Sequence, residues 1–231
     1  AENSDIDDVL KMTETRKVSI NGILQSRTYY NTRFGKGDEI QDYTLNYRFD
    51  GVTVGSTAIY YYEHEENGVK SVVRADQAWP DDPMAASVVY KGDALNTDGS
   101  IKGDALKISK TYYNTRFGKG DEIQDYTEQF KFDGKTVRSV TIYFYKGNRA
   151  DAADVDGAMN MSEVRLDSID GLLASRTYYY TGFGKGDETP DYAETYKSDG
   201  ATVQSVTIYF YGTEKGLRAD QSDINAPMVR S

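Results

Sequence analysis

The chain has 231 residues, a net charge of −10 and no cysteine. The lack of thiols excludes disulfides, thiolate catalysis and the common zinc sites. The acidic balance argues against nucleic acid and anionic membrane surfaces, because phosphate binding needs a basic stripe. No apolar run approaches the ~20 residues that span a bilayer. We therefore expect no nucleic-acid partner and no membrane span.

An internal repeat organises the sequence. Residues 28–44 read TYYNTRFGKGDEIQDYT, residues 111–127 are identical, and residues 177–193 read TYYYTGFGKGDETPDYA. A second block aligns at Ala75, Ala150 and Ala219, and the opening residues of the chain fit the same frame. The repeat predicts three β units followed by a partial fourth unit, with the boundaries 1–74, 75–149, 150–218 and 219–231.

Each unit is predicted to hold four antiparallel strands. In the second unit we expect them near residues 84–91, 106–117, 124–132 and 136–145. Glycines in the turn Gly118-Lys119-Gly120-Asp121 permit positive φ, and Asp133-Gly134 is a strong hairpin signal. The predicted fold class is all-β: a tandem, open array of three antiparallel four-stranded modules.

The partial unit at residues 219–231 bears on whether the array is open. A closed ring needs no surplus first strand. An open array can use one as a cap on its last edge or as a link to the next molecule, and we expect Pro227, Met228, Val229 and Arg230 to form this assembly strand. A chain cut from a longer array explains the surplus strand equally well.

Alternation assigns two faces to each strand. On the last strand of the second unit, Val140, Ile142 and Phe144 share a face that we expect to be buried. The opposite face is rich in Tyr, Thr, Lys and Arg, and flat tyrosine surfaces bind glycans and peptides. Packing of adjacent aromatics on both faces of a sheet is the simpler explanation. The candidate binding face comprises Tyr112, Arg116, Lys131, Tyr143 and Tyr145.

Aspartates cluster where one unit meets the next. Asp151, Asp154 and Asp156 surround Gly157, and Asp220 and Asp223 echo the pattern. Carboxylates at short spacings around a glycine suit Ca²⁺, a hard cation that takes six to eight oxygen ligands. The alternative is a solvated turn with capping aspartates. Calcium is the one cofactor that the sequence suggests.

No catalytic constellation is visible. His64, the single histidine, lies in the charged run 63–66, which we expect to be a loop, and the other units have no equivalent. A glycosidase-type carboxylate pair needs a cleft that tunes two pKa values, and thin repeat units seldom build one. We predict that the protein is not an enzyme.

Two segments carry a family resemblance. Tyr47-Arg48-Phe49-Asp50-Gly51 and Phe130-Lys131-Phe132-Asp133-Gly134 resemble the YD-type repeats of bacterial surface and toxin-shell proteins, in which a strand ending in aromatic-x-aromatic-Asp meets a glycine turn. The match covers about five residues per unit and departs where Gly follows Asp directly. The resemblance implies a surface setting.

Two functions follow as hypotheses. The first is an extracellular or cell-surface structural or adhesive repeat protein. Its copies would be filament subunits that join head-to-tail by β-strand addition. The second is a multivalent module that binds a glycan or cell-wall polymer through the repeated tyrosine-rich face.

Overall fold

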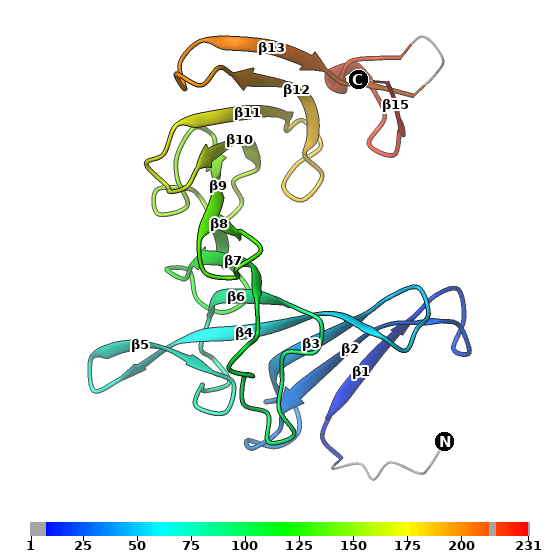
Figure 1. The fold of residues 1–231 in the computed structure, drawn as a ribbon, viewed down its shortest axis with the longest axis vertical. Coiled ribbons are helices and arrows are strands. Elements are labelled where there is room, and N and C mark those ends of the chain that lie inside the picture. Colours follow the sequence, from blue (N-terminus) through cyan, green and yellow to red (C-terminus); the bar gives the residue numbers. More distant parts are fainter. Residues whose placement is uncertain (1–7, 213–215, 231) are drawn as a thin grey trace. The chain divides into compact units, whose positions relative to one another are not determined.

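The computed structural model describes residues 8–212 and 216–230. It contains one antiparallel sheet of 13 strands whose order is β1-β2-β3-β4-β6-β7-β8-β9-β10-β11-β12-β13, with β5 paired to β4 (Figure 1). The sheet does not close on itself, so the predicted all-β, open architecture is confirmed. No helix among the described residues is long and apolar enough to cross a membrane.

The strands follow the sequence repeat. The first unit holds β1 (Met12–Arg16), β2 (Leu24–Asn31), β3 (Ile40–Tyr47), β4 (Val54–Glu66) and β5 (Val69–Arg74). The second holds β6 (Met84–Lys91), β7 (Lys107–Asn114), β8 (Ile123–Phe130) and β9 (Val137–Tyr145). The third holds β10 (Met159–Leu166), β11 (Leu173–Tyr180), β12 (Thr189–Tyr196), β13 (Val203–Ile208) and β14 (Phe210–Tyr211). The 3₁₀ turn η1 (Ala219–Gln221) and β15 (Met228–Arg230) follow.

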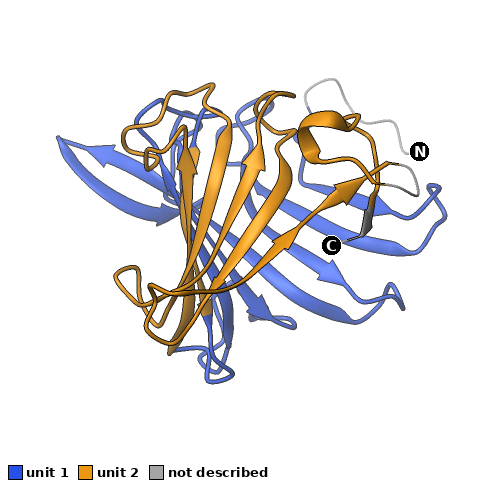
Figure 2. Ribbon diagram, turned by 90° about the horizontal axis from the view of Figure 1, so that it is seen from above, with its two compact units in different colours: residues 1–122, 130–135 blue, residues 123–129, 136–231 orange. Residues whose placement is uncertain are grey.

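The pairing register repeats together with the sequence. Met12 lies opposite Tyr29 in the first unit, and Met161 lies opposite Tyr178 in the third. By compactness the chain divides differently, into residues 1–122 with 130–135 and residues 123–129 with 136–231 (Figure 2). The three-unit domain boundaries therefore stay a prediction, although the local strand pattern recurs.

Asp-Gly turns join the third and fourth strands of each unit. In the first unit the Asp50 carboxylate accepts hydrogen bonds from the amides of Val52 and Thr53, both at 2.9 Å, and from the Thr53 hydroxyl at 2.6 Å. These bonds, the one from the Thr53 hydroxyl above all, lower the pKa of Asp50 to about 2. Gly51 has φ 67°, and a side chain there would meet Ile23 and Leu24. The turn therefore needs both residues of the Asp-Gly pair.

One tyrosine per unit is structural. The hydroxyls of Tyr62, Tyr145 and Tyr211 donate to the backbone carbonyls of Gln41, Gln124 and Pro190 at 2.5–2.7 Å. The segment that follows packs against two of these rings, Ala75 with Tyr62 and Ala150 with Tyr145. The equivalent Ala219 is fully buried as well. Tyr145, predicted on a wet face, is therefore buried because this segment folds back over it.

The first unit has an insertion that the other units lack. Strand β4 continues into a hairpin with β5 that closes at Asn67-Gly68, where both residues have positive φ. An Asn-Gly pair favours this kind of two-residue turn. His64 lies on β4 opposite Ser71, so the prediction of a charged loop at 63–66 is wrong.

Candidate assembly interface

The strand order ends at β1 and β13. In the part of the chain that the structure describes, no strand pairs with the outer edge of β1, or with the outer edge of β13 at residues 203–208. Three apolar side chains of β13 are exposed: Val203, Val206 and Ile208. Unpaired backbone groups beside apolar side chains form a surface on which another strand can add.

The junction of β9 with β10 is an internal example of such an addition. Ile142 lies opposite Glu163, Thr141 opposite Val164, and Val140 opposite Arg165. Val140 and Ile142 are almost fully buried. The sheet therefore continues from the second unit to the third through an apolar strand and a strand with a central Glu.

The two strands that end the sheet order, β1 and β13, repeat the sequences of this junction. Residues 137–145 read VRSVTIYFY, and residues 203–211 read VQSVTIYFY. Residues 161–165 read MSEVR, and residues 12–16 of β1 read MTETR. Ile142 is 3% exposed and its counterpart Ile208 is 38% exposed. β13 and β1 are thus counterparts of β9 and β10, the two strands that pair with each other at the internal junction.

The loops after β10 and β1 also match. Asp167 and Val18 both have positive φ, and the same backbone hydrogen bonds close both loops. After β10, the Asp167 amide donates across the junction to the Arg138 carbonyl at 3.2 Å, and Ile169 lines a hollow of about 300 Å³ with Ile142 and Phe144. After β1, the equivalent Ile20 is 86% exposed.

Charge reinforces the junction. Glu163 accepts hydrogen bonds from Arg165 at 2.7 Å and from Arg176 at 2.5 Å. Burial by itself raises the pKa of Glu163, but the two guanidinium groups outweigh it and the pKa is lowered. On β1, Glu14 binds Arg16 and Arg27 in the same way, and these hydrogen bonds lower its pKa. The Glu14 side chain is 25% exposed and that of Glu163 is 5% exposed.

The predicted assembly strand pairs within its own chain. Phe210 lies opposite Arg230 and Tyr211 opposite Met228, and the Gly212 amide donates to the Pro227 carbonyl at 3.0 Å. The same pairing recurs between Tyr145 and Met159 at the internal junction. The tail thus covers the end of the β13 edge and leaves residues 203–208 open. A linking role for residues 227–230 stays a prediction.

The candidate calcium ligands are not gathered. Among the described residues, no group of three or more His, Asp or Glu side chains is placed to hold a metal ion. The Asp154 carboxylate lies 3.9 Å from Lys146 Nζ. The remaining candidates, Asp151, Asp156, Asp220 and Asp223, belong to the exposed or half-exposed turns that follow β9 and β14. Calcium binding stays a prediction.

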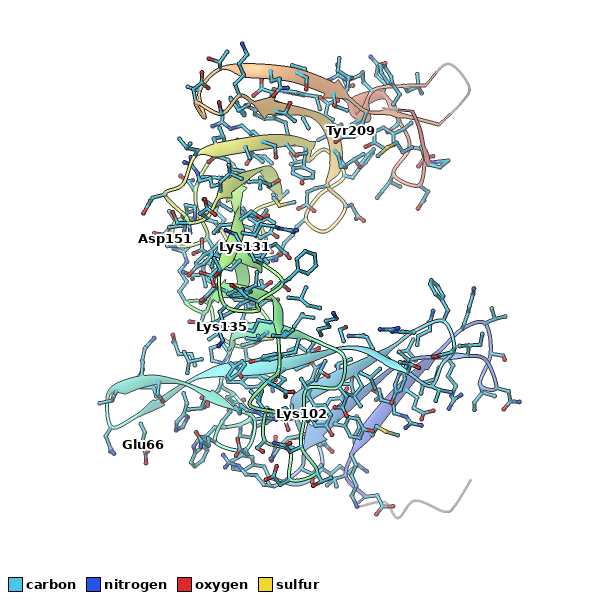
Figure 3. The ribbon with its side chains drawn as sticks, in the orientation of Figure 1. Glu66, Lys102, Lys131, Lys135, Asp151 and Tyr209 are labelled. Atoms are coloured by element: carbon cyan, nitrogen blue, oxygen red, sulfur yellow. The ribbon has the colours of Figure 1, made fainter. Side chains whose placement is uncertain are left out.

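The candidate binding face is distributed over both compact units. Tyr112, Arg116 and Lys131 belong to the first and Tyr143 and Tyr145 to the second. Lys110 Nζ lies 4.2 Å from the Tyr112 ring centre, and Arg116 covers Phe117. Lys131 follows the end of β8 and is exposed (Figure 3). Because Tyr145 is buried, it adds no surface for a ligand.

The GKGDE turn fastens the start of the first strand of each unit. Glu122 and Glu188 accept hydrogen bonds from the amides of Met84 and Met159 at 2.8 and 2.9 Å. Glu39 accepts a hydrogen bond from the Leu10 amide at 2.9 Å, and this bond lowers its pKa. The glutamate of the repeat is therefore structural.

No protein-family model, curated protein or solved structure matches the chain. The resemblance to YD-type repeats stays a prediction.

Proposed function

We propose that the protein is a structural repeat protein of the cell surface or extracellular space whose copies assemble head-to-tail into filaments, with β1 of one copy adding to the outer edge of β13 of the next. The observation that carries this proposal is the sequence similarity of β13 to β9 and of β1 to β10, because β9 and β10 pair inside the chain. No catalytic chemistry is required of the protein.

The internal junction defines the register of the proposed contact. Equivalent residues place Glu14 opposite Ile208, Thr15 opposite Thr207, and Arg16 opposite Val206, as Glu163, Val164 and Arg165 lie opposite Ile142, Thr141 and Val140. Ile20 then lies beside Phe210, because the equivalent residues Ile169 and Phe144 line the same hollow. The contact removes the exposed apolar side chains of both edges from water, which favours association.

A contact between two different patches of the same molecule continues from copy to copy wherever the rotation does not close a ring. Inside the chain, antiparallel pairing already joins successive units twice, at β4·β6 and at β9·β10. The net charge of −10 keeps assembled chains apart and soluble.

The proposal is tested by sedimentation velocity and negative-stain electron microscopy of the purified chain over rising concentration. We expect a concentration-dependent series of oligomers and short filaments. Ile208→Lys places a charge on the β13 edge, where native proteins use lysine to block strand addition, and is expected to leave a folded monomer. Val69→Lys is the matched control, because Val69 is an exposed apolar residue of β5, a strand outside the proposed contact. This variant should assemble normally.

Monomers of the unaltered chain at every concentration would refute the proposal. Assembly of Ile208→Lys at the level of the unaltered chain would refute the use of β13.

A further inference from the structure

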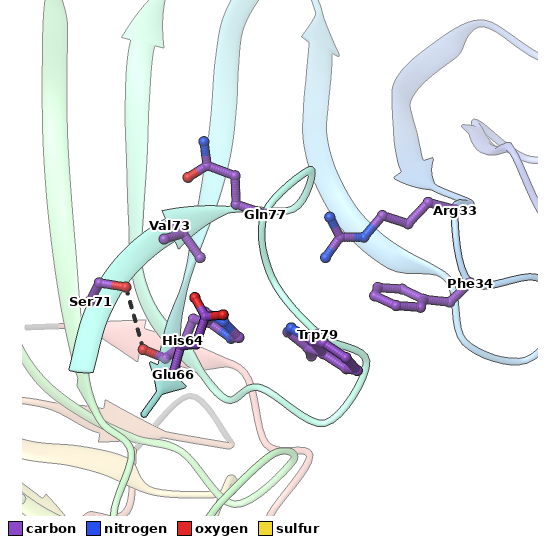
Figure 4. Close-up of a pocket in the computed structure, with 8 residues that line it drawn as sticks. All are labelled: Arg33, Phe34, His64, Glu66, Ser71, Val73, Gln77 and Trp79. Atoms are coloured by element: carbon purple, nitrogen blue, oxygen red, sulfur yellow. Dashed lines mark hydrogen bonds between the residues drawn. The ribbon is translucent and has the colours of Figure 1, made fainter. Parts of the chain in front are cut away.

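The insertion of the first unit builds an open hollow that the strand repeat does not require. Its volume is about 530 Å³, within the roughly 300–1,000 Å³ of small-molecule sites. The hairpin contributes His64, Glu66, Ser71 and Val73; the following segment contributes Gln77 and Trp79; and the turn after β2 contributes Arg33 and Phe34 (Figure 4). All belong to one compact unit.

Three rings form an aromatic platform at this hollow. Trp79, the single tryptophan of the chain, is 57% exposed. Its ring centre lies 5.5 Å from that of Phe34, and the planes of these two rings are tilted by 36°. Its ring centre lies 6.3 Å from that of His64, to which it is nearly parallel. Figure 4 shows Trp79 between the other two. A large ring left half in water, flanked by two more rings, offers a flat face for stacking.

The platform is held in place before any ligand arrives. The Asp82 carboxylate accepts a hydrogen bond from the Trp79 amide at 2.7 Å and lies 2.8 Å from His64 Nδ1. Arg33 donates to the carbonyls of Asp76 and Ala78, and its guanidinium lies 4.4 Å from the centre of the Phe34 ring. Such preorganisation reduces the entropy lost on binding.

Polar groups at the hollow remain available for hydrogen bonds. The side chains of Glu66 and Gln77 make no hydrogen bond or ion pair with the described residues. Glu66 lines the hollow, the Asp82 carboxylate lies 2.8 Å from His64 Nδ1, and the whole chain is acidic. A ligand with a flat apolar face, many hydroxyls and no negative charge fits this combination.

We infer that the hollow binds a pyranose ring of a neutral glycan, which stacks on Trp79 and Phe34 while its hydroxyls bond to Glu66 and Gln77. The site is distinct from the repeated tyrosine face and from the strand edges of the proposed assembly. The hollow recurs with every copy of the chain, so an assembled filament gains avidity for a polymeric glycan from many weak contacts.

Trp79 is its own reporter, because it is the only tryptophan. The purified chain is titrated with cellohexaose, laminarihexaose, maltohexaose, mannohexaose and chitohexaose while tryptophan emission is recorded. We expect a saturable change with at least one of them. No change with any of the five would overturn the inference.

Two variants locate the binding. Phe34→Ala should weaken binding of the active oligosaccharide about fivefold to tenfold, the effect of one lost aromatic contact. Phe183→Ala, at the equivalent position of the third unit and outside the compact unit that holds the hollow, should leave binding unchanged. Calorimetry of Trp79→Ala should show no heat of binding. Equal affinity of Phe34→Ala and the unaltered chain would contradict the proposed site. All of these outcomes are independent of filament formation, since Ile208→Lys monomers should bind equally well.

Discussion

The two places where the sheet passes from one unit to the next differ at their centres. At the β4·β6 junction Ile59 faces Val88, and Tyr90, Ala94 and Leu95 complete an apolar cluster around them. At the β9·β10 junction Ile142 faces Glu163, which two arginines neutralise. The first junction is held by apolar packing, and the second combines an apolar strand with a shielded charge.

The outer edges of the sheet, at β1 and β13, resemble the second junction. β13 carries Val206 and Ile208 in the places of Val140 and Ile142, whereas β4 has Thr57 and Ile59 there. β1 carries Glu14 in the place of Glu163, whereas β6 has Val88. A strand with a central Glu and its arginines can face water when it is unpaired. The same strand can also pair with an apolar strand, as β10 pairs with β9. Our proposal is that the charged type of junction is the type used between molecules.

The largest expected effect comes from the apolar junction. Ile59→Ala should lower the free energy of unfolding by about 2–5 kcal/mol, because it leaves a cavity at a fully buried site. Ile208→Ala, the same position on the free edge, should change it by about 0.5 kcal/mol or less. Urea denaturation of both variants at a low concentration of monomer measures the difference. Equal losses would contradict the distinction between a closed and an open edge.

Removing the arginines tests the charged junction. The double variant Arg165→Met and Arg176→Met leaves a buried carboxylate without a cation, and we expect a loss of about 2–4 kcal/mol at neutral pH, less than for fully buried pairs because both arginines are partly exposed. Glu163→Val, which copies the β4·β6 junction, is the control and should be close to neutral. A larger loss for Glu163→Val than for the double variant would refute the charge argument.

The pH dependence of this comparison has a definite sign. The pKa of Glu163 is lowered in the native chain, so its contribution to stability is present above the unfolded value near 4.3 and is lost as the pH falls through the folded value. In the double variant the uncompensated carboxylate gains from protonation. The stability gap between the two proteins should therefore narrow between about pH 6 and pH 4, as measured by denaturation at each pH.

A smaller effect is expected from the tail. In the proposed contact, Met12 of the incoming strand and Arg230 of the tail need the same partner, Phe210. Deleting residues 227–231 should therefore lower the concentration of half-assembly several-fold in sedimentation experiments. Weaker assembly after the deletion would instead favour the tail itself as the linking strand.

The smallest effect concerns the Asp-Gly turns. Hydrogen bonds, first of all from Thr53 and Thr202, lower the pKa of Asp50 and of Asp199 to about 2. Their stabilisation is present above the unfolded value near 3.9 and is lost as the pH falls towards 2. The double variant Asp50→Asn and Asp199→Asn should show a shallower fall of the melting temperature between these pH values. Parallel melting curves would contradict this role.

Much of the fold was predictable because the repeat and the alternation of side chains act locally. In the second unit the strand at Met84–Lys91 has the predicted bounds, and Val140 and Ile142 are buried as expected. Alternation gives the face of Tyr145 but not what covers that face, and the returning segment at Ala150 buries it. The charged residues around His64 favoured a loop, but they belong to a strand. The Asn67-Gly68 pair in the sequence was a hairpin signal that indicated this strand.

The candidate interface was only partly accessible from the sequence. The sequence shows directly that residues 203–211 resemble residues 137–145 and that β1 resembles β10. Its meaning depends on which strands become neighbours across units, and that is decided by long-range pairing. The hollow at Trp79 depends on two contacts between distant parts of the chain, that of Arg33 with the Ala78 carbonyl and that of His64 with Asp82.

Because the chain has no cysteine, a directed disulfide measures the proposed register directly. Thr15→Cys and Thr207→Cys are placed on separate copies, one of them tagged, and the mixture is oxidised. Opposed residues of an antiparallel pair have Cα atoms roughly 4.5–5.5 Å apart, within the range of a disulfide. We predict rapid formation of a dimer that contains one copy of each variant, and little product when Ser205→Cys replaces Thr207→Cys. Equal crosslinking of the two mixtures, or none in either at concentrations where the unaltered chain assembles, would contradict addition of β1 to β13.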